Sequence, residues 1–202
     1  MDRRDVTLRE AMQEHLVTNG FPTDGGLSER WVTARVGPVA VCIPNVSARK
    51  RALPNHDLNH LVGGYGHDDL GEAEIGAFEI GSGCRGYMAA WVLDWSALLL
   101  GMVRSPRRLF AACVRGRRSG NLYGTDLDLV LDLPVSVVRS SLGLDRCHKG
   151  HLGDLMLVLG AVIVAPLVAV VPALASLLTC PVWLAYRARG VRSPAGSTTS
   201  PS

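Results

Sequence analysis

Two histidines and two carboxylates with metal-ligand spacing lie between residues 56 and 72. His56 and His60 are separated by three residues, Asp57 follows the first histidine, and eleven residues separate the second histidine from Glu72. On a helix, His56 and His60 face the same side one turn apart, so both imidazoles can hold one cation. Two histidines with carboxylate oxygens suit Zn, Fe or Mn better than Mg or Ca. The pattern predicts a divalent-metal site, with zinc as the first choice.

The two carboxylates are predicted to reach the metal from different places. Asp57 lies about 100° around a helix from His56, so it either ligates at the edge of the site or orients a histidine. Glu72 follows a glycine-rich loop and supplies its carboxylate from the head of the next helix. Ordinary alternatives stay open, because a His-x-x-x-His pair often arises by chance and Glu72 also suits a helix N-terminus.

Further polar residues lie near the pattern, and Glu79 among them has two interpretations. Glu79 lies two turns after Glu72 on the same helix face, where it either lines the same cavity or points at solvent. His67, Asp68 and Asp69 follow the glycines and are typical of an ordinary polar loop. The sequence does not decide between these readings.

Helices are expected to position the pattern. Residues 47–53 suggest a short helical turn, after which Pro54 starts a new helix that reaches Val62. The glycines from Gly63 onward end it, and the helix that carries Glu72 is expected over roughly 72–82.

The chain before this region predicts one helix and a less regular segment. Thr7 and Glu10 form a capping box at the start of a first amphipathic helix. Small and β-branched residues over 31–43, broken by Gly37-Pro38, indicate either a short hairpin or an extended arm.

The chain after this region is again helical in pattern. Residues 87–103 are apolar around Asp94 and predict a buried core helix. Residues 104–118 predict an amphipathic helix with a face of arginines, and a further helix is expected from Pro134 to Gly143. The fold class is therefore predicted to be all-α, a compact helical domain.

A long apolar run, Leu155 to Tyr186, holds 32 residues without a charge. A membrane-spanning helix needs about 20. The run is interrupted by Pro166, Pro172 and Pro181, so both a kinked transmembrane span and a re-entrant hairpin are open. Basic residues flank both ends, at Arg146 and Lys149 and at Arg187, Arg189 and Arg192. By the positive-inside rule this favours the hairpin with both flanks in the cytoplasm, and a buried hairpin in a soluble protein is the alternative.

These features divide the chain into a helical metal-binding domain at 1–150, a membrane-associated segment at 151–187 and a disordered tail at 188–202. The net charge of +3 is too small to argue for a nucleic-acid partner. Five scattered cysteines without a Cys-x-x-Cys pair predict reduced thiols in a cytosolic setting.

The order His-Asp-x-x-His, eleven residues, then Glu resembles the motif of the ubiquinone (coenzyme Q) biosynthesis protein four family. Its flanks are similar too: the segment 61–66 reads Leu-Val-Gly-Gly-Tyr-Gly, and Leu70-Gly71 precede Glu72. Two further segments are less closely similar to the family: Arg107-Arg108-Leu109-Phe110 and Arg117-Arg118. The resemblance covers roughly residues 10–145.

The resemblance implies an all-α protein, peripheral to the membrane, in which His56, Asp57, His60 and Glu72 are metal ligands. It also implies a prenyl lipid near the metal, other quinone-biosynthesis enzymes as partners, and replacement of a ring carboxylate by a hydroxyl. Two departures stand out. The apolar C-terminal run is foreign to the family pattern, and His67 stands where a small polar residue is usual and has the chemistry of an extra donor.

The function expected from the sequence is a metal-dependent, membrane-associated step of ubiquinone or related prenyl-quinone biosynthesis, either oxidative decarboxylation or lipid presentation. One rival is a metal-dependent hydrolase, for which His15 and Asp126 are the only loose candidates for the additional residues. Another is a non-catalytic membrane scaffold with a structural metal, whose arginine face at 104–118 binds anionic headgroups or is simply solvated. Catalytic residues, metal identity and oligomeric state stay undetermined.

Overall fold

The computed structural model describes residues 6–36 and 39–188. The expected break at Gly37-Pro38 and residues 189–202 of the expected tail lie outside the described residues. Within them the chain is helical apart from one two-stranded ribbon and an isolated bridge between Thr7 and Pro134. This confirms the all-α prediction.

The first helix and the ribbon follow their local sequence signals. Helix α1 (Leu8–Thr18) begins with the predicted capping box, in which Thr7 and Glu10 satisfy each other's backbone donors. Strands β1 (Trp31–Val36) and β2 (Val39–Pro44) pair in antiparallel register from Trp31 opposite Pro44 to Val36 opposite Val39. Of the two interpretations of this segment, the hairpin is therefore correct.

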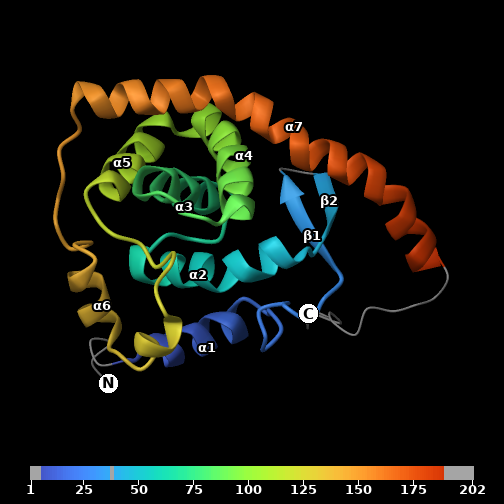
Figure 1. Ribbon diagram of the computed structural model, residues 1–202, viewed down its shortest axis with the longest axis horizontal. Helices are drawn as coiled ribbons and strands as arrows, with labels where there is room; N and C mark the ends of the chain where they lie inside the picture. Colours follow the sequence, from blue (N-terminus) through green and yellow to red (C-terminus); the bar gives the residue numbers. More distant parts are fainter. Residues whose placement is uncertain (1–5, 37–38, 189–202) are drawn as a thin grey trace, which may run out of the picture.

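Helix α3 (Asp69–Ser82) is the centre of the fold, and every residue from Ala73 to Ile80 is buried. It packs against α4 (Met88–Arg104) and α5 (Pro106–Arg117), and Figure 1 shows these helices with α2 (Ser47–Gly63) wrapped around it. A short 3-10 helix η2 (Leu127–Leu129) and helix α6 (Val135–Ser141) close the side near α1.

Helix α2 differs from the prediction of a turn followed by a new helix at Pro54. It is one helix from Ser47 to Gly63 with Pro54 inside it. An interior proline removes one helical hydrogen bond at a cost of about 3 kcal/mol, but the helix buries Ala52, Leu58 and Val62 against the core. The free energy gained by burying that face outweighs the local tendency of Pro54 to interrupt the helix.

Helix α4 is present as predicted, but it is not buried all round. Asp94 and Leu98 face the core, whereas Leu93 and Leu100 on another side are more than a third exposed. Residues 87–103 are apolar on both sides of the helix because one side packs on the core and the other lines a cavity.

The apolar C-terminal run forms a single helix, α7 (Leu152–Ala188), so the preference for a re-entrant hairpin is wrong. A proline bends a helix without ending it when the neighbouring residues are strong helix formers, and α7 curves over the domain in Figure 1. It is the one candidate membrane span among the described residues, and only 18% of its most apolar window is buried. Its first part shares the hydrophobic core with the domain through Val158 and Ala161.

Candidate metal centre

Two helices meet at the predicted site. Helix α2 carries His56 and His60 toward its C-terminal end, where Gly64 stops it with a φ of 74° that favours glycine. Helix α3 starts again after a short loop, with the Asp68 side chain accepting a hydrogen bond from the Gly71 amide. Glu72 therefore lies in the first turn of α3 and reaches back toward α2.

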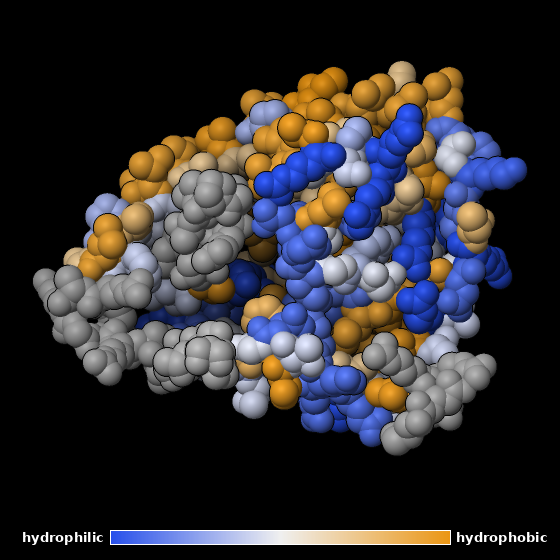
Figure 2. Space-filling view, turned by 180° about the vertical axis from the view of Figure 1, so that it is seen from behind, coloured by the Kyte–Doolittle hydropathy of each residue, from blue (hydrophilic) through white to orange (hydrophobic). Residues whose placement is uncertain are grey.

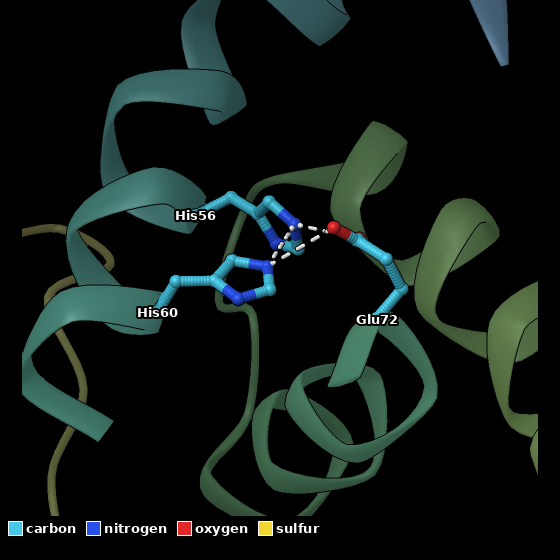
Figure 3. A group of neighbouring side chains, drawn as sticks. All are labelled: His56, His60 and Glu72. Carbon is cyan, nitrogen blue, oxygen red and sulfur yellow. Dashed lines mark hydrogen bonds and ion pairs between the residues drawn. The ribbon is translucent and has the colours of Figure 1, made fainter. Parts of the chain in front are cut away.

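The donor atoms of His56, His60 and Glu72 converge (Figure 3). The two histidine Nε2 atoms are 3.1 Å apart, and each lies 3.5 Å from a different oxygen of Glu72. Ligand atoms about 2.0–2.1 Å from one cation at tetrahedral or octahedral angles are roughly 2.9–3.4 Å apart. The spacing of this trio fits one divalent metal ion.

The other ring nitrogen of each histidine is already engaged, which directs both Nε2 atoms into the site. His56 Nδ1 lies 3.1 Å from Glu79 Oε2, and His60 Nδ1 lies 3.4 Å from the Tyr65 carbonyl oxygen. Metal-binding histidines usually donate their second N–H to a carboxylate or a carbonyl. This arrangement supports the fit of a metal independently of the donor spacing.

Glu79 is itself held in place. Its side chain is fully buried, the Asn59 amide donates to Oε1 at 2.8 Å, and the Tyr123 hydroxyl donates to Oε2 at 2.9 Å. Of the two interpretations of Glu79, the inward one is therefore correct. The position of Glu79 on the face of Glu72 was the signal for it, whereas nothing in the sequence pointed to Tyr123.

The charges of the site support one another. Burial opposes a charged His56, but the Glu79 and Glu72 carboxylates raise the pKa of His56 well above its usual value. Burial likewise opposes the Glu72 carboxylate, yet hydrogen bonds from the surrounding histidines, beginning with His56 and His60, hold the pKa of Glu72 far below normal. His56 holds the pKa of the buried Glu79 low in the same way. The site thus keeps its two glutamates ionised, as a cation requires.

Asp57 lies in the wall of the adjoining cavity, and it is not among the trio whose donor atoms come within 4.8 Å of one another. Burial raises the pKa of Asp57 to about 6. Its role as a fourth ligand stays a prediction, and the structure brings together three of the four residues that the motif named.

A stack of histidines adjoins the trio. His67 Nδ1 is 3.6 Å from Glu72 Oε1, and its ring lies 4.0 Å from that of His60 and 4.2 Å from that of His15. His67 is therefore more than an ordinary loop residue. Asp126, the other candidate for a hydrolase site, instead caps the short helix η2 and is absent from the residues lining the cavity.

A second group of donors lies behind His56. Asp94 is buried next to Glu79, and donor atoms of His56, Glu79 and Asp94 also lie within 4.8 Å of one another. The Cys84 thiol is 3.1 Å from Asp94 Oδ2. Burial and the neighbouring Glu79 raise the pKa of Asp94 well above normal, which disfavours the charged carboxylate that a metal ligand needs.

A cavity of about 610 Å³ opens beside the trio. Its wall is mainly apolar and comes from α1 and the following loop, the ribbon, and helices α2 and α4, including Leu16, Phe21, Val32, Ile43, Leu53, Leu93 and Leu100. Arg49 is the one lysine or arginine among the lining residues. The site can therefore receive a molecule with an apolar body and a polar end that faces His56 and Glu72.

The arginine face of α5 is largely occupied within the protein. Arg108 forms a bidentate pair with Glu74, and Arg117 and Arg118 both pair with Asp154 at the start of α7. Arg115 donates to the carbonyl oxygens of Gly63 and Leu144. These contacts join α5 to its neighbours, and binding of anionic headgroups by the arginine face stays a prediction.

No protein-family profile, curated protein or solved structure matches this chain. The resemblance to the ubiquinone biosynthesis protein four family therefore rests on the motif and its flanks.

Proposed function

We propose that this protein is a metal-dependent, membrane-associated protein of ubiquinone or related prenyl-quinone biosynthesis that acts on a prenylated ring. The observation that carries the proposal is that His56 and Glu72, two of the three converging donors, line a mainly apolar cavity. A prenylated ring acid has the matching shape, with an apolar chain and oxygen atoms at one end. The resemblance of the motif points to the same class of substrate.

In this proposal each residue has a defined task. His56, His60 and Glu72 hold the metal, Zn, Fe or Mn, and Glu79 keeps His56 in the productive orientation. When bound, the metal polarises the oxygen atoms of the substrate. Arg49, in the same cavity, offers a positive charge to an acidic ring substituent. One version of the reaction replaces the ring carboxylate by a hydroxyl: an oxygen-donating two-electron oxidant of the dioxygen or peroxide class supplies the hydroxyl oxygen, and the carboxylate leaves as carbon dioxide. The other version is presentation of the lipid to partner enzymes of the pathway.

The proposed location is a membrane, with the metal domain on the cytoplasmic side. The length and hydropathy of α7 and its poor burial support attachment to lipid. The basic residues on both sides of the apolar run support the cytoplasmic side.

The test is elemental analysis of the purified protein with organic extraction of the same sample. Wild type is expected to hold about one equivalent of Zn, Fe or Mn and a prenyl lipid, and Glu72→Ala to lose the metal. Glu14→Ala, an exposed acid on α1, is the matched control and should keep it. Absence of metal from wild type after growth and purification with all three ions would overturn the proposal.

The same variant separates an enzyme from a scaffold with a structural metal. An enzyme is expected to keep its thermal unfolding transition in Glu72→Ala and to lose turnover of the prenylated ring acid. A scaffold would instead lose its fold together with its metal, because a structural metal contributes directly to folding free energy.

A further inference from the structure

The inner face of α7 is part of the folded domain. Val158, Ala161 and Ala165 recur every three or four residues and are at most 4% exposed. Asp154 in the first turn pairs with Arg117, the last residue of α5, and with Arg118, which follows it. The helix also packs against α4 and β2, so it is held to the domain by two elements that also line the cavity.

The outer face of α7 is apolar over most of its length. Large hydrophobic side chains that are at least 47% exposed recur at the same three- and four-residue spacing: Met156, Leu159, Ile163, Leu167, Val170, Val171, Leu174, Leu177 and Leu178. That spacing keeps them on one side of a helix. Figure 2 shows apolar side chains gathered along the edge of the molecule where α7 lies in Figure 1.

The length of α7 argues against a simple crossing of the membrane. Its candidate span, Leu152–Ala185, has 34 residues, which is about 51 Å of helix. The hydrocarbon core of a bilayer is about 30 Å thick, so the whole segment would need a tilt of about 54°, beyond the usual 0–40°. A crossing by the whole segment would also pull Val158, Ala161 and Ala165 away from the core that they cover.

We propose that α7 lies flat in one leaflet of a bilayer, with its inner face on the domain and its outer face in the lipid. The surface binds a lipid bilayer, because the apolar run carries no charge for 32 residues and has basic residues on both sides. Such flanks suit the headgroup region next to an in-plane helix. The chain is therefore monotopic, and both ends of α7 stay on the same side of the membrane.

This placement brings lipid close to the cavity. Helix α4 packs against the inner side of α7, and the same helix lines the cavity with Leu93, Ala97 and Leu100. A bilayer on the outer side of α7 is thus one helix away from the cavity wall. The flat placement itself does not depend on the proposed metal chemistry.

The first experiment measures flotation of the full-length protein with phosphatidylcholine vesicles that contain a minority of phosphatidylglycerol. The double variant Ile163→Asp with Leu167→Asp charges the outer face at two side chains that are 74% and 73% exposed. It should lower the vesicle-bound fraction about ten-fold and keep the helical circular dichroism of wild type. Val17→Asp, 76% exposed on α1, is the matched control and should bind like wild type. Equal binding by all three proteins, or a lipid-free wild-type dimer that ignores vesicles, would overturn the proposal.

The second experiment distinguishes a flat helix from a crossing helix. Cys147 is exposed just before α7, and Ser200→Cys in a Cys147→Ser background places a reporter after it. In inverted bacterial membrane vesicles, a membrane-impermeant maleimide should label both reporters without detergent. Labelling of one reporter only after detergent would show that α7 crosses the bilayer and would reject the flat placement, whatever the metal content of the protein.

Discussion

At the scale of single residues, Glu79 fixes the candidate metal centre because it leaves His56 only one free ring nitrogen. The His56 Nδ1 atom faces Glu79, so its Nε2 atom must face Glu72 and His60. Asn59 and Tyr123 in turn prevent Glu79 from turning away. The geometry of the three donors thus depends on buried groups that never touch the metal.

Glu79→Gln should weaken metal binding while preserving the shape of the buried network. The amide lacks the negative charge that favours a donated proton at His56 Nδ1, so the metal affinity is expected to fall about 10–100-fold. The affinity can be measured by competition with a chelating dye, with circular dichroism to check the fold. Tyr123→Phe, which leaves the carboxylate in place, should have a smaller effect. Unchanged affinity in Glu79→Gln would mean that Glu79 does not orient His56.

Asp57→Asn should stabilise the metal-free protein in a way that depends on pH. Burial raises the pKa of Asp57 to about 6, against about 3.9 in an unfolded chain. The folded state therefore holds this proton more tightly than the unfolded chain does. As a result, the free energy of unfolding decreases as pH rises from about 4 through 6. The variant lacks this cost, so it should be more stable than wild type at pH 7, by up to about 3 kcal/mol, and little different near pH 4.

Urea denaturation at the two pH values measures this difference. An equal gain at both would show that the effect is not due to the charge of Asp57. If the variant also binds metal less tightly than wild type, the prediction that Asp57 is a ligand gains direct support.

Sequence spacing was enough to find the three donors, since helical periodicity alone places His56 beside His60. It was not enough to find their supports. The Tyr123 hydroxyl reaches Glu79 from a loop that is 44 residues away, and the Tyr65 carbonyl reaches His60 only because the chain turns at Gly64. Such contacts depend on tertiary packing, which no local pattern encodes.

At the scale of secondary-structure elements, close packing of α3 against α5 fixes the position of the site. A Cβ atom on Gly116 would overlap the Phe78 carbonyl oxygen, and one on Gly81 would overlap the Cys113 carbonyl oxygen. The two helices therefore approach backbone to backbone where each presents a glycine. This contact fixes α3, and with it Glu72 and Glu79, against the rest of the domain.

Gly116→Ala should therefore lower the free energy of unfolding by about 1–3 kcal/mol or more, because backbone atoms cannot make room for a methyl group. Gly160→Ala in α7 is the matched control, since nothing lies within 4 Å of its added methyl group. There the better helix propensity of alanine should raise stability by about 0.5–1 kcal/mol. Chemical denaturation of both variants in the same detergent measures the pair, and a loss of stability in both would contradict the packing explanation.

Prolines mark the places where element boundaries were not predictable from the sequence. Pro54 in α2 and Pro166 in α7 were expected to begin or interrupt helices, yet both lie within one. A proline inside a helix costs about 3 kcal/mol, whereas one in the first turn costs little. In α2 the continuous helix is favoured by the apolar face that it buries, and this depends on partners elsewhere in the chain.

Helix α7 closes the fold at the scale of the whole molecule. Its Val158 and Ala161 belong to the same hydrophobic cluster as Leu8 of α1 and Phe78 of α3. A domain boundary at residue 150 thus separates two segments that share one core. The candidate membrane helix is also a structural helix, so its loss should lower the stability of the domain that carries the candidate metal site.

Ending the chain after Lys149 should therefore destabilise the domain and not simply make it independent of membranes. The truncation removes Val158, Ala161, Ala165 and the partner of Arg117 and Arg118. Loss of these buried apolar groups alone costs about 3 kcal/mol or more, a large share of the roughly 5–15 kcal/mol that holds a domain together.

Thermal unfolding followed by circular dichroism tests this expectation. The chain that ends at Lys149 should melt well below wild type or without a cooperative transition, whereas a chain that ends at Val171 keeps the three buried residues and should melt closer to wild type. The metal centre provides a second measurement, because α4 lines its cavity and packs on α7. If the chain ending at Lys149 melts like wild type and binds metal as tightly, α7 is only an anchor and the metal domain folds without it.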